Sequence, residues 1–370
     1  MESFSIGILL FFVVFGLLRH DSKIATAGLL LLLYMLFAFE RSLADYERYL
    51  EYYDEIKSGF GHANELEPLY VLSCSTAAKM GMSFDQMRYI FCFLEISLLY
   101  KVIRQYTKKT ALVLALFFIF PAMIEAELFR FLFGMTLIIY ALPNLFSYSK
   151  KNYIKYFVFV TLAGLFHSSC FIFFIYYLLV VKKRKELVII VSTLLFLGTM
   201  TISADSLFGV FGHLPIREAV IAKYETDSYA NTNGVLFSVI KQTLIFSLAL
   251  VAIIGFKDRC LIHKPSKTDD NAMLLNSRII DLNLISLLML IPMYLSSSSQ
   301  RLVHVVVFYN FIAVANGSLA HKWKFRWIYA FFVSVCLLIF VLFIESSGTV
   351  YAFVSHFTEG FLVNFTEQYL

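Results

Sequence analysis

The feature that most constrains this chain is a succession of apolar runs separated by short polar loops. A helix that crosses a bilayer needs about 20 apolar residues, with a usual range of roughly 17 to 25. Backbone N–H and C=O groups cannot stay unpaired in lipid, so each run is expected to form a helix. Twelve runs are candidates, and several are short: Ser3–Leu18, Ile24–Phe39, Phe84–Ile103, Thr110–Ile124, Leu128–Phe146, Tyr153–Ala163, Ser168–Val181, Leu187–Ile202, Val235–Phe256, Arg278–Leu295, Leu302–Asn316 and Trp327–Ile344.

The composition agrees with a membrane protein. Hydrophobic residues make up 59% of the chain and charged residues 15%, which excludes an ordinary soluble domain. Forty Phe and 22 Tyr suit packing against lipid and interfacial belts. Residues 1–18 lack a basic start and a small-residue cleavage site, so they are expected to be a retained span. We therefore predict an all-α polytopic membrane protein that forms a single membrane domain over residues 1–370.

One further apolar segment, Leu69–Met82, leaves the number of spans open. It is short and interrupted by Ser, Lys and Gly, which favours a segment that lies at the membrane surface. The chain then has about 12 spans with both termini outside. If the segment does cross, the number is 13 and Met1 moves inside.

Basic residues predict the orientation. They gather in every second loop, which is the pattern of cytoplasmic loops. The formal net charge of +5 is spread over these loops, so it indicates topology, and no nucleic-acid partner is expected. The remaining loops are then outside, and two of them, 40–67 and 203–234, are long. The first contains Leu43–Lys57, where Tyr and acidic residues at helical spacing predict an amphipathic surface helix.

Several kinds of chemistry have no support in the sequence. The five cysteines are an odd number without a CxxC pair, and no HExxH spacing occurs, so no metal is expected. There is no Walker loop and no GxGxxG, so no nucleotide cofactor is expected either. No internal repeat is visible, which weakens the prediction of an inverted-repeat transporter.

Two arginines open apolar runs on the predicted outer side. Glu127 and Arg130 are three residues apart, so on one helix they would share a face and could pair. Alternatively Arg130 binds an anion, because a guanidinium forks onto phosphate oxygens. Arg301 is a second arginine of this kind, and two of them would suit a diphosphate. Three residues of the long outer loop are further candidates for binding: Arg217, Lys223 and Tyr224.

Aromatic and acidic residues of the first outer loop could bind sugars. Tyrosine rings stack on sugar faces and carboxylates accept from hydroxyls, which makes Asp45, Tyr46 and Tyr49 candidates. The same residues could instead rest on lipid headgroups. Glu67 precedes a proline at a predicted helix start, where a carboxylate is also favoured for structural reasons. His167 lies in a tight outer turn, either as a hydrogen-bonding residue or as a proton acceptor.

The order of these motifs resembles a known family. An outer D-Y-x-x-Y segment beginning at Asp45 is followed by E-P-x-Y from Glu67, a span-opening Arg130, F-H-S-S at 166–169 and a late Arg301. This succession over residues 43–310 resembles the EpsG-like branch of the Wzy polysaccharide polymerases. The chain departs from the family pattern before the Asp, where Ser-Leu-Ala stands in place of the usual Gly, and after Arg130, where Phe-Leu-Phe stands in place of Gln and Ala.

The resemblance implies a membrane glycosyltransferase of the GT-C type on the outer, periplasmic face of the bacterial inner membrane. It implies joining of undecaprenyl-diphosphate-linked oligosaccharide repeat units into O-antigen, capsule or exopolysaccharide, without a cofactor, and with a chain-length regulator as a further partner. Transfer needs a base near the acceptor hydroxyl and a cationic clamp on the departing diphosphate. We expect Arg130 and Arg301 to form the clamp, with Glu127 beside them, and Asp45, Glu67 or His167 to act as the base.

Two other functions remain open from the sequence. A flippase or transporter for the same lipid-linked saccharide would also be a bundle of many spans with buried arginines. A glycan ligase would move the finished polymer to another acceptor. The long outer loops favour the polymerase over the transporter.

Overall fold

The structure is a computed structural model, and it describes residues 2–39, 45–59, 66–147, 149–180, 267–289 and 297–317, with a few isolated positions between them. These residues form helices only. Their bounds in chain order are α1 (Glu2–Leu18), α2 (Lys23–Phe39), α3 (Tyr46–Ser58), α4 (Pro68–Lys79), α5 (Phe84–Tyr106), α6 (Thr110–Phe117), η2 (Phe118–Ala122), α7 (Met123–Ala126), α8 (Phe129–Ala141), η3 (Leu142–Leu145), α9 (Lys150–Phe166), η4 (Ser168–Val180), α14 (Lys267–Ser286), η5 (Leu287–Met289), η6 (Ser297–Val303) and α16 (His304–Gly317).

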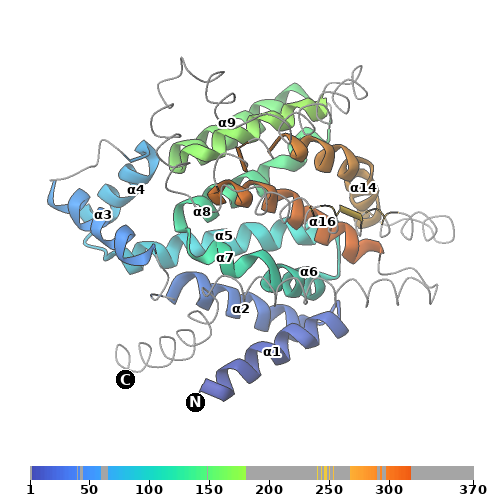
Figure 1. Ribbon diagram of the computed structural model, residues 1–370, viewed down its shortest axis with the longest axis horizontal. Coiled ribbons are helices and arrows are strands. Elements are labelled where there is room, and N and C mark those ends of the chain that lie inside the picture. The colour runs from blue at the N-terminus through green and yellow to red at the C-terminus, as the bar shows by residue number, and fades with distance from the viewer. Residues whose placement is uncertain are drawn as a thin grey trace.

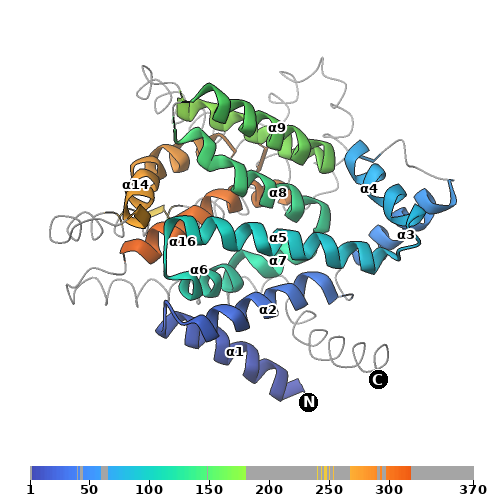
Figure 2. The ribbon, with the colours of Figure 1, turned by 180° about the vertical axis from the view of Figure 1, so that it is seen from behind.

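The apolar runs of the described residues fold as the sequence predicts, as helices that pack side by side. Figures 1 and 2 show three tiers, with α1 and α2 on one side, α5, α6 and α16 in the middle, and α8 and α9 on the other side. By length and apolar character, one described helix, Asp270–Met289, could cross a membrane alone. Five shorter apolar helices accompany it. The predicted spans over 187–202, 235–256 and 327–344 lie outside the described residues, as does the 203–234 loop.

The long helices run between two ends of the bundle, and one of these ends is basic. This basic end carries Lys101 and Arg104 on α5, Lys109 before α6, and Lys150 and Lys151 at the start of α9. Hydrogen bonds tie the helices together there: the side-chain amide of Asn271 donates to the carbonyl of Gln105, and the Lys101 ammonium donates to the Tyr140 hydroxyl.

The opposite end carries α3 and α4, which project from the bundle in Figure 1. The Arg41 guanidinium, just after α2, donates to the Asp85 carboxylate at the start of α5 at 2.6 Å. The end of α2 and the start of α5 are therefore at the same end of the bundle. With 12 residues, α4 is about 18 Å long, well below the roughly 30 Å of a hydrocarbon core.

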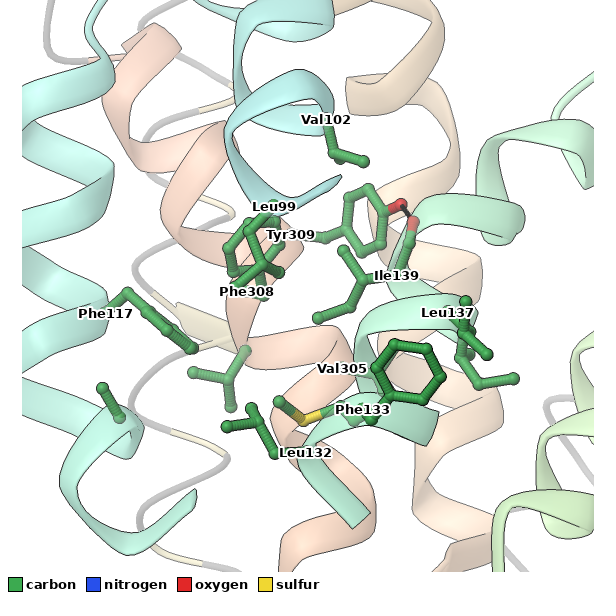
Figure 3. Close-up of a cluster of buried hydrophobic side chains, with 14 of the residues drawn as sticks. Leu99, Val102, Phe117, Leu132, Phe133, Leu137, Ile139, Val305, Phe308 and Tyr309 are labelled. Carbon is green, nitrogen blue, oxygen red and sulfur yellow. Dashed lines mark hydrogen bonds between the residues drawn. The ribbon is translucent and has the colours of Figure 1, made fainter. Parts of the chain in front are cut away.

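Aromatic and aliphatic side chains fill the interior between the tiers. Figure 3 shows Phe117, Phe308, Tyr309 and Ile139 in contact, and the buried Tyr309 hydroxyl donates to the carbonyl of Ile139. Close helix approach depends on Gly134 of α8, where an added Cβ would come within 2.6 Å of the Cys170 sulfur. Close packing of this kind holds the helix ends, and so the polar side chains on them, in fixed positions.

Three sequence predictions are corrected by the structure. The predicted helix Thr110–Ile124 is broken, because Phe120 leaves the helical conformation ahead of Pro121 and a separate turn, α7, follows. Glu127 and Arg130 therefore do not share a helix face: α7 ends at Ala126 and α8 begins at Phe129. The helix predicted to begin at Arg278 begins at Lys267, because the polar segment before Arg278 is helical as well.

Candidate functional site

Arg130, in the first turn of α8, is held by a carboxylate that lies 63 residues away in the sequence. Its Nη1 donates to Oε2 of Glu67 at 2.5 Å. The other oxygen of Glu67 accepts from the backbone N–H of Ser168 at 2.9 Å and from the Ser168 hydroxyl at 3.1 Å. The starts of α4, α8 and η4 thus meet at one carboxylate. The Arg130 Nε is buried and makes no hydrogen bond to the described residues.

Three tyrosine rings surround the Arg130 guanidinium. The guanidinium carbon is 5.2 Å from the ring centre of Tyr70, 5.5 Å from that of Tyr49 and 5.8 Å from that of Tyr52. Tyr49 and Tyr70 are buried, because α3 lays one aromatic face on α4. The ring faces attract the cation and restrict its movement, so the orientation of the Arg130 guanidinium is fixed.

A second polar group joins the α7 turn to the segment that enters α16. Glu127 lies 4.0 Å from Nη2 of Arg301, and both side chains are about a quarter exposed, at 24% and 22%. One turn further in, Oε1 of Glu125 is hydrogen-bonded to Nδ1 of His304. Both of these side chains are almost fully buried, at 0% and 1% exposure. The helix break at Pro121 brings Glu125 to His304, since the turn it starts carries the carboxylate.

The two polar groups are electrostatically linked through Tyr49, whose ring lies against Arg130. The charges of both Arg130 and Arg301 act on the Tyr49 hydroxyl, as does that of Asp45. Asp45 also acts on Glu127. Arginines from α8 and η6 therefore both lie at the α3–α4 end of the bundle, and their charges act on the same tyrosine.

The carboxylates of the two groups differ in pKa. Burial works to raise the pKa of Glu67, but the N–H of Ser168 and the charge of Arg130 outweigh it, so the pKa lies below its ordinary value. Burial raises the pKa of Glu127, Arg301 partly offsets this, and Asp45 adds to the rise. Glu67 is consequently a fixed anion and a weak base near neutral pH, whereas Glu127 takes up a proton more readily.

The structure places His167 next to this region, at the end of α9. Its Nδ1 lies 2.8 Å from the Ser169 hydroxyl, and its ring packs edge-on against Phe131. The charge of His167 acts on the Glu67 carboxylate and contributes to lowering its pKa.

The tyrosines of the first outer loop are turned toward the protein. Tyr46 donates its hydroxyl to Asp85 at 3.0 Å, and Arg88 lies over its ring. Tyr46, Tyr49 and Tyr53 are all buried, and they hold α3 in place. Tyr52 is the more exposed ring beside Arg130. Tyr46 and Tyr49, which the sequence suggests as sugar-binding residues, are therefore packed against the protein in this structure.

Sequence reasoning missed several members of the site. It passed over His304 because that residue begins an apolar run, although an ionisable group inside such a run is itself a signal of function. The contacts of Tyr52 and Tyr70 with Arg130, and of the Ser168 N–H with Glu67, were not predicted because these partners are distant in the sequence. Arg217, Lys223 and Tyr224 lie outside the described residues. Among the described residues, no group of three or more His, Cys, Asp or Glu side chains is placed to hold a metal ion.

Comparison with known proteins identifies the family. No curated protein and no solved structure matches the chain. The sequence profile of the EpsG family matches residues 23–357, which include every residue of the site. Because this match covers most of the chain, and because the motifs of the resemblance meet in one place in the fold, the chain belongs to the EpsG family.

Proposed function

We propose that this protein polymerises undecaprenyl-diphosphate-linked oligosaccharide repeat units by glycosyl transfer on the outer face of the bacterial inner membrane. Membership in the EpsG family indicates polysaccharide biosynthesis by a membrane polymerase. The observation that carries the finer proposal is the position of two arginines at the end of the bundle opposite the basic end: Arg130 is held by Glu67 and the Tyr49 ring, and Arg301 lies opposite Glu127.

The proposed donor sets the chemical demand on the site. Glycosyl transfer from a lipid diphosphate leaves negative charge on the departing diphosphate, and fixed cations stabilise that charge. Arg130 is suited to this task because it is fixed by Glu67 and three rings, while its Nε makes no hydrogen bond within the part of the chain that the structure describes. Arg301 is suited because its contact with Glu127 is long, at 4.0 Å, and because a guanidinium can fork onto phosphate oxygens. Both are proposed to bind the diphosphate.

In this proposal Glu67 positions Arg130. Its lowered pKa and its three hydrogen bonds favour a fixed anion over the base predicted from the sequence. Asp45 and His167 remain candidates for contacts with the acceptor, because Asp45 acts on Glu127 and His167 borders Glu67. A chain-length regulator remains a proposed partner on the same side of the membrane.

Reconstitution tests the proposed function. Full-length protein in proteoliposomes is supplied with lipid-linked repeat units extracted from a deletion strain of its host. The expected product is a ladder of lipid-linked oligomers, together with released undecaprenyl diphosphate. Movement of repeat units across the bilayer without a ladder would identify a flippase. Transfer of a preformed polymer onto another acceptor, again without a ladder, would identify a ligase.

Cysteine labelling tests the proposed orientation. Ser58 is exposed at the end of α3, and Lys151 is exposed at the start of α9 at the basic end. Positively charged loops stay in the cytoplasm, so a Ser58→Cys variant should react with an impermeant maleimide in intact spheroplasts. A Lys151→Cys variant is the matched control and should react only after permeabilisation. The unsubstituted protein gives the blank, and labelling of Lys151→Cys in intact spheroplasts contradicts the orientation.

A further inference from the structure

Two side chains of the α7 turn face two side chains of the segment entering α16. Glu127 lies opposite Arg301, and Glu125 lies opposite His304. Arg301 and His304 are three residues apart at the junction of a 3-10 helix and an α-helix, where residues at this spacing point the same way. Arg301 and His304 thus lie on one face of one helical segment, and each of them faces a carboxylate of the α7 turn.

The inner pair has the form of an acid–base group. Glu125 fixes the His304 ring by holding Nδ1, so the other nitrogen, Nε2, is on the side of the ring away from this carboxylate. The His304 ring also packs edge-on against Phe120, which limits its rotation. Burial raises the pKa of Glu125 to about 8, and the charge of Arg301 partly offsets this rise. When Glu125 is ionised, its carboxylate stabilises the imidazolium that forms as His304 accepts a proton.

A second observation points to a ligand beside this pair. The other oxygen of Glu125, Oε2, is completely buried and has no hydrogen-bond partner among the described residues. A buried carboxylate oxygen without a partner is costly, so such atoms are retained where a substrate group or a bound water supplies the partner. The charge of Glu125 acts in turn on a further buried carboxylate, Glu95 of α5.

We propose that His304 is the general base of the polymerase and that Glu125 is the residue that positions it. This inference rests on the proposed function and deepens it, since it supplies the base that the clamp requires. The acceptor hydroxyl oxygen bonds to the anomeric carbon of the donor, and the bond from that carbon to the diphosphate oxygen breaks. The bonding pair leaves with the diphosphate, beside Arg301 and Arg130. The hydroxyl proton passes to Nε2 of His304, which later releases it to water.

Substitution at His304 is the first test, in the proteoliposome assay. His304→Gln keeps hydrogen-bonding capacity but cannot take up the proton, so turnover should fall at least about 100-fold. Binding of undecaprenyl diphosphate, measured as a shift in melting temperature, should remain, because the clamp is intact. His20→Gln, at the basic end, is the matched control and should keep wild-type turnover. Substantial turnover by His304→Gln overturns the proposal.

The pH profile of Glu125→Gln is the second test, and it also separates catalysis from folding. The base works only when neutral, so turnover declines at low pH. Glu125→Gln removes the carboxylate that is proposed to stabilise the imidazolium, so the acid limb of the profile should move to lower pH. Glu127 and Arg301 on the facing elements and Glu95 on α5 are unchanged in this variant. An unmoved acid limb overturns the role of Glu125.

The outcomes distinguish this inference from the proposed function. If wild-type protein forms no ladder, the proposed function fails, whatever the variants do. If wild-type protein forms a ladder and His304→Gln does so equally well, the function stands and His304 is not the base. If His304→Gln loses diphosphate binding together with turnover at an unchanged melting temperature, His304 belongs to the binding site, and the proposal is again overturned.

Discussion

Arg130→Lys should abolish polymer formation while the protein accumulates at its normal level. Lysine keeps the positive charge, but it loses the planar fork that can bind phosphate oxygens while Glu67 is held. It also loses the planar surface that three tyrosine rings enclose. Removing one fixed donor from a transition-state site typically reduces turnover by roughly 100-fold to 1000-fold, and we expect a loss in that range. Gel analysis of the polymer and an immunoblot of the membrane fraction measure the two quantities.

Arg104→Lys is the matched control for this variant. Arg104 is an exposed arginine at the basic end, far from Glu67 and Arg301. Its substitution should leave the polymer unchanged. Arg301→Lys should reproduce the defect of Arg130→Lys, since both side chains are proposed to hold one diphosphate. Full-length polymer in both Arg130→Lys and Arg301→Lys would show that neither arginine is needed as a fork, and would refute the clamp.

The helices of the described region were predictable from the sequence because the physical reasons for them are local. Apolar runs of near-membrane length have to form helices, and the spacing of tyrosines in Leu43–Lys57 gave α3 to within a few residues. The alternation of basic loops likewise predicted that Lys101, Lys150 and their neighbours share one end. The break in Thr110–Ile124 was harder to predict. Its proline was visible, but a proline alone does not fix which way the following turn points.

The pairings of the candidate site were not predictable, because they depend on tertiary packing. Glu67 and Arg130 are 63 residues apart, and Glu125 and His304 are 179 residues apart. Residue chemistry identified Arg130 and Arg301 as cations that need an anion. It could not tell whether that anion is Glu127, Glu67 or a substrate. His304 is the clearest omission. Its apolar neighbours predict a membrane span, and the sequence alone gives its ring no partner.

Glu67→Ala should be among the most destabilising single substitutions at the α3–α4 end. It removes the carboxylate from Arg130 and leaves the Ser168 N–H without its acceptor. Both ionic side chains are only 16% exposed, so the loss of one partner should cost about 3 kcal/mol. For a chain of this size that corresponds to a fall in melting temperature of roughly 5 °C in detergent. The double variant Glu67→Ala/Arg130→Met should recover much of the loss, because no unpaired charge remains buried. Independent, additive losses would mean that the two side chains are not coupled.

The pH dependence of this pair has a definite sign. The pKa of Glu67 is below its ordinary value of 4.5, because the Ser168 N–H and Arg130 outweigh the effect of burial. A depressed carboxylate pKa contributes stability that is fully present above the unfolded-state pKa and is lost as pH falls through the folded-state value. The difference in melting temperature between wild type and Glu67→Gln should therefore be constant above about pH 5 and should shrink below roughly pH 4. Glu51→Gln, at an exposed carboxylate of α3, is the control and should show almost no difference at any pH. A Glu67→Gln difference that grows as the pH falls would mean that the folded protein favours protonated Glu67, and would rule out the fixed-anion role.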